Sequence, residues 1–151
     1  MSEEKLGYCI DCDEDVVFVE KEELQHCVVR GLEFSYMAIH PYCPKCGNLL
    51  FDFGLEKINQ INRFDAYKKL KGLLTTKDIK RIRKKYNLSQ TQLAKAIKIG
   101  EKNIARYETG AIQDESIDLL IRLLDSNPEL FGIASNEKKT NKQPKLKYRT
   151  I

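Results

Sequence analysis

The chain has 151 residues and carries 26 Lys and Arg against 22 Asp and Glu, a net charge of +4. A chain of this length can bury a substantial core. It contains no apolar run near the roughly 18 residues that span a bilayer and no charged and apolar leader, so we expect a cytoplasmic protein rather than a membrane protein.

The charge is unevenly distributed along the chain. Residues 1–74 hold 9 basic against 13 acidic residues, whereas residues 75–151 hold 17 against 9. A basic C-terminal half favours a polyanionic partner such as DNA, because lysine and arginine side chains displace the counterions that DNA condenses. The acidic half would not contribute to that binding, so the composition predicts two parts with different partners.

Four of the five cysteines form two pairs of the same spacing, Cys9-x-x-Cys12 and Cys43-x-x-Cys46, with 30 residues between the pairs. Cytosolic thiols are kept reduced, which favours metal ligation over disulfides. Four thiolates at this spacing suit tetrahedral Zn²⁺, and we predict one structural zinc ion per chain. A set of four core thiols is the alternative, which the shared spacing disfavours. Four sulfur ligands leave no open metal position for catalysis, so we expect no enzyme activity.

The segment around the cysteine pairs is rich in β-prone residues. Short strands are predicted at residues 16–20, 25–29, 32–40 and 48–51. A turn is expected at Arg30-Gly31. The run 32–40 places alternate apolar side chains on one side: Leu32, Phe34, Tyr36 and Ala38. Residues 1–53 are therefore predicted to form a small antiparallel β module clamped by zinc, and metal binding would supply much of its folding free energy.

The remaining cysteine and the two histidines carry no clear chemistry. Cys27 stands beside two valines in a predicted strand, which favours a buried thiol without a function. His26 and His40 could form a Cys/His pair or replace a zinc ligand. Neither histidine has ligand spacing to the paired cysteines, and no carboxylate is placed to orient one for catalysis. Structural or solvent-facing positions are expected for both.

Residues 54–74 are predicted to contain a connecting helix and a linker. A helix is predicted from residue 54 to residue 70, because apolar residues recur every three positions: Leu55, Ile58, Ile61 and Phe64. Gly72 then ends the helix. We interpret this apolar stripe as a core face or a dimer seam rather than as a groove for a partner.

A second helix is predicted from residue 76 to residue 86. Thr75 and Asp78 form a cap with an acidic first turn, and Ile79 and Ile82 face inward. The helix also carries five cations: Lys80, Arg81, Arg83, Lys84 and Lys85. A solvated face is the default interpretation of such a cluster, and phosphate contact by part of it is the alternative that their number favours.

The stretch from residue 88 to residue 110 has the pattern of a helix-turn-helix. Ser89 and Gln92 form a capping box that predicts a helix starting near Gln90. Gly100 can cap a second helix over residues 101–109, which a left-handed Gly110 would end. The inward side chains of this second helix are Ile104 and Tyr107.

The outer face of the predicted helix-turn-helix is the surface that we expect to contact DNA. The candidate residues are Glu101, Lys102, Asn103 and Arg106 in the second helix, Gln90 and Gln92 in the first, and Lys98 in the join. Arg106 would pair with a guanine edge, and Lys102 or Asn103 would reach a neighbouring base or phosphate. The two glutamines at a helix N-terminus would bind phosphate.

The last predicted helix covers residues 114–125 and ends near Asn127-Pro128. Its inward residues are Ile117, Leu120, Ile121 and Leu124. With a final turn at residues 129–131, it completes an all-α domain over residues 75–133. Residues 134–151 hold six Lys or Arg and little apolar periodicity, which predicts a disordered basic tail; a DNA-reaching arm is the alternative.

Two levels of family resemblance follow from these motifs. The stretch that contains LSQTQLA and IARYETG resembles the lambda-repressor-like, or XRE-type, helix-turn-helix. When the cysteine pairs, IKRIRKKYNLSQ and LLIRLLDSNPELF are added, the chain from residue 8 to residue 131 resembles the MqsA antitoxins with a YgiT-type zinc finger. The fold class expected is α+β, with the zinc-clamped β module followed by an all-α lambda-repressor-like domain.

The resemblance implies a type II toxin-antitoxin role in a bacterial, nucleoid-associated protein. The zinc module would hold a small toxin, and the helical domain would dimerise on a palindromic operator and repress its own operon. The family reads bases with an Asn and an Arg four residues later. Arg106 matches the Arg, but the position of the Asn is occupied by Lys102, and Asn103 is one place off. The operator sequence therefore need not be the one that the family binds. Lys98 stands where this motif often has glycine.

Three other functions compete with the antitoxin hypothesis. A stand-alone regulator of a phage or mobile element would use the same DNA surface without a toxin. A zinc hydrolase would need an open metal position, which four thiolates do not leave. A protein-binding module with a degenerate helix-turn-helix would lack salt-dependent DNA affinity.

Overall fold

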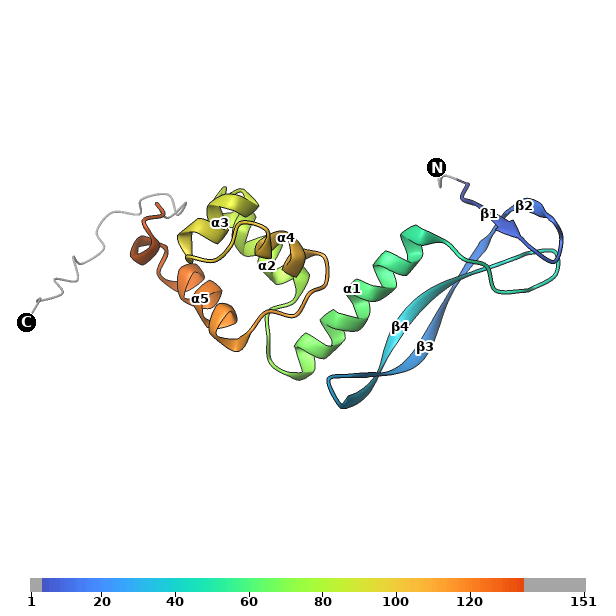
Figure 1. Ribbon diagram of the computed structural model, residues 1–151, viewed down its shortest axis with the longest axis horizontal. Coiled ribbons are helices and arrows are strands. Elements are labelled where there is room, and N and C mark those ends of the chain that lie inside the picture. Colours follow the sequence, from blue (N-terminus) through green and yellow to red (C-terminus); the bar gives the residue numbers. More distant parts are fainter. Residues whose placement is uncertain (1–3, 135–151) are drawn as a thin grey trace, which may run out of the picture.

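The computed structural model describes residues 4–134, so the predicted basic tail lies almost entirely outside the described residues. Four strands precede a helical region of five α-helices (Figure 1). The elements are β1 (Leu6–Cys9), β2 (Glu14–Val17), β3 (Val19–Val29), β4 (Leu32–Tyr42), α1 (Phe53–Leu70), α2 (Thr76–Lys85), α3 (Gln90–Ala96), α4 (Asn103–Glu108), α5 (Glu115–Ser126) and the 3₁₀ turn η1 (Pro128–Phe131). The strands occupy one end of an elongated molecule, and α2 to α5 occupy the other (Figure 1). The predicted α+β class is confirmed.

The strands form two separate antiparallel pairs, β1 with β2 and β3 with β4. The sequence did not predict β1, and it placed two short strands where the long strand β3 and part of β2 lie. The break comes at Phe18, which is buried and donates its N–H to the Lys5 carbonyl at 3.2 Å. Four consecutive β-prone residues hide this change of sheet, since periodicity alone does not mark it.

The β3–β4 hairpin closes at Arg30 and Gly31, as predicted. Both residues have positive φ, +49° and +80°, as expected for a two-residue turn between twisted strands. The strand predicted at residues 48–51 is wrong: the segment makes only one isolated bridge, between Tyr42 and Leu49. It instead follows the second cysteine pair as an irregular connection to α1.

Helix α1 lies along one face of the β3–β4 hairpin (Figure 1). The predicted inward residues Phe34, Tyr36 and Ala38 are buried on that face. From the helix, Asn59 exchanges two hydrogen bonds of 2.8 Å with the backbone of Ile39. The helix begins where the Asp52 side chain accepts the N–H of its third residue. Packing on the hairpin and this cap together fix the start and the direction of α1.

The predicted apolar stripe of α1 is only partly correct. The residues that α1 buries include Leu55, Asn59 and Tyr67, which recur at multiples of four, whereas Ile58 is 41% exposed. Ile61 and Phe64 lie within 3.8 Å of the position that a Cβ on Gly110 would occupy, and Phe64 also packs against the buried residues of the β3–β4 hairpin. The three-residue spacing therefore combined residues that contact different neighbours.

The helices α2 to α5 share one hydrophobic core. Its buried members are Leu74, Ile79, Ile82, Tyr86, Leu93, Ala94, Ile97, Ile104, Tyr107, Ile121 and Leu124. The predicted capping box of Ser89 and Gln92 is present at α3, and the predicted cap of Thr75 and Asp78 at α2 is also a capping box. These caps satisfy helix N–H groups that would otherwise lack partners. Helix α5 starts and ends within one residue of its predicted bounds.

Polar contacts fasten α1 to this helical core. Asp65 accepts hydrogen bonds from the backbone N–H and hydroxyl of Thr76, at 2.9 and 2.6 Å. Lys68 is fully buried and donates to the carbonyl of Tyr107 at 3.3 Å. This burial was not predicted from the sequence, because lysine is rarely buried. Helix α1 therefore contacts both the β3–β4 hairpin and the helical core.

Candidate functional site

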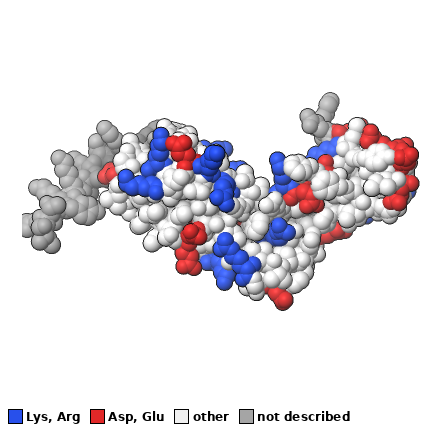
Figure 2. Space-filling view, in the orientation of Figure 1, with Lys and Arg blue, Asp and Glu red and all other residues white. Residues whose placement is uncertain are grey.

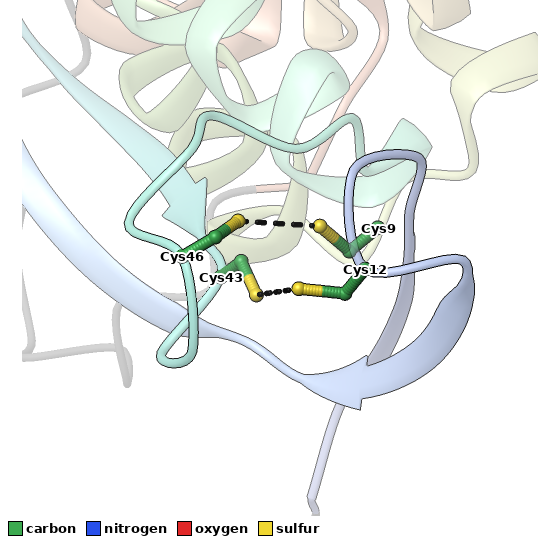
Figure 3. Close-up of side chains that lie close together, drawn as sticks. All are labelled: Cys9, Cys12, Cys43 and Cys46. Carbon is green, nitrogen blue, oxygen red and sulfur yellow. Dashed lines mark hydrogen bonds between the residues drawn. The ribbon is translucent and has the colours of Figure 1, made fainter.

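The strands β1 to β4 with their connections are called the strand module below. The two cysteine pairs meet at its end, as the spacing predicted (Figure 3). Cys9 ends β1 and Cys43 follows β4, while Cys12 and Cys46 lie in the turns after them. All four sulfur atoms lie within 4.8 Å of one another. The Cys9–Cys46 and Cys12–Cys43 Sγ distances are 3.5 and 3.9 Å. Sulfurs at the corners of a zinc tetrahedron are about 3.8 Å apart, so the four thiols could hold such an ion.

Backbone geometry shapes the second cysteine turn. Gly47 has a φ of +77° and donates its N–H to the Cys43 carbonyl at 2.8 Å. Cys43 in turn donates to the Asn48 carbonyl at 2.9 Å. The Asn48 side chain also donates to Asp11 of the first cysteine turn. These bonds hold the two cysteine turns facing each other.

The protonation of the thiols fits a cation site. Backbone N–H groups, of Cys46 first and then of Lys45, lower the pKa of Cys43 to about 7. Desolvation, followed by hydrogen bonds from the other three cysteines, raises the pKa of Cys12 to about 12. Four thiols therefore cannot all ionise together without a counter-charge, which a divalent metal ion would supply.

Cys27, His26 and His40 lie outside the group of four cysteines, as expected. Cys27 is half-buried in β3 opposite Phe34, and burial raises the pKa of its thiol. His26 is exposed. The His40 Nε2 lies 2.9 Å from the Gln25 Oε1 across the hairpin.

At the other end of the molecule, the helix predicted over residues 101–109 begins later than expected. Helix α4 starts at Asn103, and Glu101 and Lys102 belong to the turn before it. Gly100 does not act as the N-cap: its carbonyl accepts the Asn103 N–H at 3.1 Å, which forms a tight turn. Lys102 occupies the N-cap position and makes no side-chain cap. The glycine cap prediction was wrong because two turn residues, Glu101 and Lys102, lie between Gly100 and the start of the helix.

Most of the candidate contact residues are at the surface. Glu101, Lys102 and Arg106 are exposed, whereas Asn103 is half-buried and packs over Gly100. The Arg106 N–H donates to the Lys102 carbonyl at 3.3 Å, so these two residues lie one turn apart. The predicted inward residues of α4 are buried. Helix α4 therefore exposes Arg106, one turn after the exposed Lys102 that precedes the helix, and packs its apolar side on the core.

The candidate DNA contacts in and beside α3 differ in exposure and in backbone geometry. Gln92 is exposed, and its side-chain oxygen accepts the Ser89 N–H at 2.8 Å in the capping box. Gln90 is half-buried. Lys98 is exposed with a φ of +60°, a left-handed conformation that explains why glycine suits this join.

The family follows from a match to most of the chain. Residues 8–133 match the family described as the antitoxin component of a bacterial toxin-antitoxin system, MqsA. The chain belongs to this antitoxin family. No curated protein matches the sequence. Membership gives the chain an antitoxin role, implies a toxin as its partner and favours a non-enzymatic regulator.

Charge in this MqsA-family antitoxin separates along the molecule. Lys and Arg side chains gather over the helical end, and Asp and Glu side chains dominate the far tip of the strand module (Figure 2). Among residues 4–134, no helix is long and apolar enough to span a membrane. The separation follows the charge asymmetry of the sequence and sets apart the surfaces that could meet different partners.

Two of the five cations of α2 form ion pairs within the protein, which disfavours the predicted phosphate contact for these two residues. Arg83 is held by Glu108, with its Nη2 2.9 Å from Oε1 and its Nε 2.9 Å from Oε2. Lys85 pairs with Asp125 at 3.2 Å. The acid partners lie 25 and 40 residues away, so a local charge count could not reveal them.

Proposed function

We propose that this antitoxin is a sequence-specific DNA-binding repressor that binds its own operator as a homodimer. Two exposed cations support the proposal: Lys102 at the N-cap position of α4, and Arg106 one turn further along the helix, whose inner side packs on the apolar core. In the dimer, each α4 enters the major groove, and two successive half-sites lie about one helical turn (~34 Å) apart.

Arg106 is assigned to base recognition. Its guanidinium is exposed and has no ion pair within 4.0 Å among residues 4–134. It can therefore donate two hydrogen bonds to the O6 and N7 atoms of a guanine. Lys102 reaches a neighbouring base or phosphate. It suits this role better than Asn103, whose side chain packs over Gly100.

Contacts to the DNA backbone come from the start of α3 and from the join. Gln90 and Gln92 face phosphate at the N-terminus of α3, where helix N–H groups favour an anion. The capping box engages only the side-chain oxygen of Gln92, so its amide NH₂ group can donate to phosphate. Lys98 adds an exposed cation, while Glu101 restrains Lys95 through a pair at 3.5 Å.

The strand module has the other role in this proposal. Residues 1–53 bind one structural Zn²⁺ through Cys9, Cys12, Cys43 and Cys46 and hold the toxin, residues 54–74 connect the parts, and residues 75–133 bind DNA. Of the 16 exposed large apolar side chains among the described residues, 11 lie between residues 6 and 53. That concentration supports a protein partner at this end. Family membership favours this role over that of a stand-alone regulator.

The test of the proposal is DNase footprinting on the promoter region of the antitoxin's own operon. Two protected half-sites with dyad symmetry, centred about 10 base pairs apart, are expected. Their affinity should fall steeply as salt is raised. Absence of any protected sequence at antitoxin concentrations that bind the toxin would contradict the repressor role.

A further inference from the structure

The β3–β4 hairpin has one covered and one uncovered face. Side chains alternate across the ladder, so Phe34, Tyr36 and Ala38 all point to the face on which α1 lies (Figure 1). The register places the neighbouring residues on the opposite face. Among residues 4–134, no element covers that face along the middle of the hairpin.

The uncovered face has an apolar centre. Leu24 and Met37 stand directly opposite each other in the register and are 71% and 48% exposed. Val28, on the same face, is 57% exposed. Single exposed apolar residues are ordinary, but a directly opposed pair with a third residue beside it forms a patch. Exposure of this patch to water does not stabilise the hairpin.

Acidic side chains flank the apolar centre. Glu22 and Glu33 share the face and have no ion pair within 4.0 Å among the described residues, while Glu20 pairs with Lys5 at 2.9 Å. No Lys or Arg occupies the strand positions of this face. More broadly, residues 4–52 carry four Lys or Arg against ten Asp or Glu, a difference of −6.

We propose that this hairpin face is the docking surface for the toxin. The toxin contacts it with an apolar patch that covers Leu24 and Met37 and with flanking Lys or Arg side chains that meet Glu22 and Glu33. The inference rests on the proposed toxin-binding role of the strand module and specifies both the surface and the chemistry of the partner. A basic partner follows because no Lys or Arg stands at a strand position of this face and Glu22 and Glu33 have no ion pair within 4.0 Å among residues 4–134.

The experiment measures binding of the full-length, zinc-loaded antitoxin to the small protein encoded beside its gene, by calorimetry. The variant Leu24→Lys/Met37→Lys places two cations on the face without disturbing the buried side. We expect it to weaken binding by about 30-fold or more, as loss of an interface centre does. The matched control Leu70→Lys changes a side chain that is 61% exposed on α1, and it should change affinity by about twofold or less.

Two further readouts separate a lost contact from a lost fold. Zinc content and circular dichroism of the double variant should equal those of the wild type. In the wild-type complex, peroxide should oxidise Met37 more slowly than in the free antitoxin, because the toxin covers its thioether. Glu22→Gln/Glu33→Gln should slow association and reduce its salt dependence.

The outcomes distinguish the two proposals. Wild-type affinity in the folded Leu24→Lys/Met37→Lys variant, or an unchanged rate of Met37 oxidation in the complex, would overturn the assignment of this face and leave toxin binding by the antitoxin intact. Failure of the wild-type antitoxin to bind the neighbouring protein would overturn both the toxin-binding role and this inference.

Discussion

The ion pair between Arg83 and Glu108 gives the sharpest stability prediction. The Arg83 and Glu108 side chains are only 17% and 1% exposed, and Arg83 also donates to the Leu88 carbonyl at 3.1 Å. Two unit charges about 4 Å apart attract by about 4 kcal/mol at an effective dielectric constant near 20. Removal of one partner of a buried pair costs a similar amount, about 3 to 5 kcal/mol, because the remaining charge stays buried. Arg83→Ala should therefore lower the free energy of unfolding by about 3 kcal/mol or more.

Urea unfolding followed by far-UV circular dichroism measures this loss. The control Arg81→Ala removes an exposed arginine that lies 3.9 Å from Asp78, and it should cost less than about 0.5 kcal/mol. The double variant Arg83→Met/Glu108→Leu should recover most of the lost stability, since apolar residues can replace a buried pair. It should also keep the salt dependence of DNA affinity. An Arg83→Ala variant within about 1 kcal/mol of the wild type would refute a structural role for the pair.

Three further predictions concern the join, the buried lysine and the metal centre. Lys98→Gly should raise the free energy of unfolding by up to about 1 kcal/mol, because glycine adopts a φ of +60° without strain; a lower urea midpoint would contradict this. Burial lowers the pKa of Lys68, so the folded state holds this proton less tightly than the unfolded state, whose pKa is near 10.5. The unfolding free energy of the wild type should therefore rise relative to Lys68→Met as the pH increases through the folded pKa toward 10.5; parallel pH profiles would argue against it. Cys43→Ser should abolish zinc binding, measured by atomic emission, and unfold the strand module, while operator affinity is retained because α2 to α5 have their own core; loss of both would show that the two parts fold as one.

Local chemistry made much of this fold predictable. The capping boxes at Ser89 and Thr75 use only neighbours in sequence, so the starts of α2 and α3 could be read directly. The grouping of the four cysteines was predictable for a similar reason, since the spacing of two metal ligands within one turn is a local feature of the sequence. The turn at Arg30-Gly31 and the alternation of β4 belong to the same class of signal.

Other features depend on contacts between distant parts of the chain. Asn59 is buried because its amide matches the backbone of Ile39, and no pattern within α1 reveals that partner. The burial of Lys68 depends on where α4 ends. The late start of α4 has a local cause, the tight turn at Gly100, but glycine fits both a cap and a turn, so the sequence did not distinguish them.

Base recognition by Arg106 of α4 can be tested by comparing specific and random DNA. Fluorescence anisotropy would compare wild type, Arg106→Ala and the control Lys57→Ala on the operator and on random DNA of equal length. We expect Arg106→Ala to lose about 1 to 3 kcal/mol of binding free energy on the operator and little on random DNA, with Lys57→Ala close to the wild type on both. An equal loss for Arg106→Ala on both DNAs, or no loss on the operator, would contradict base reading by this helix.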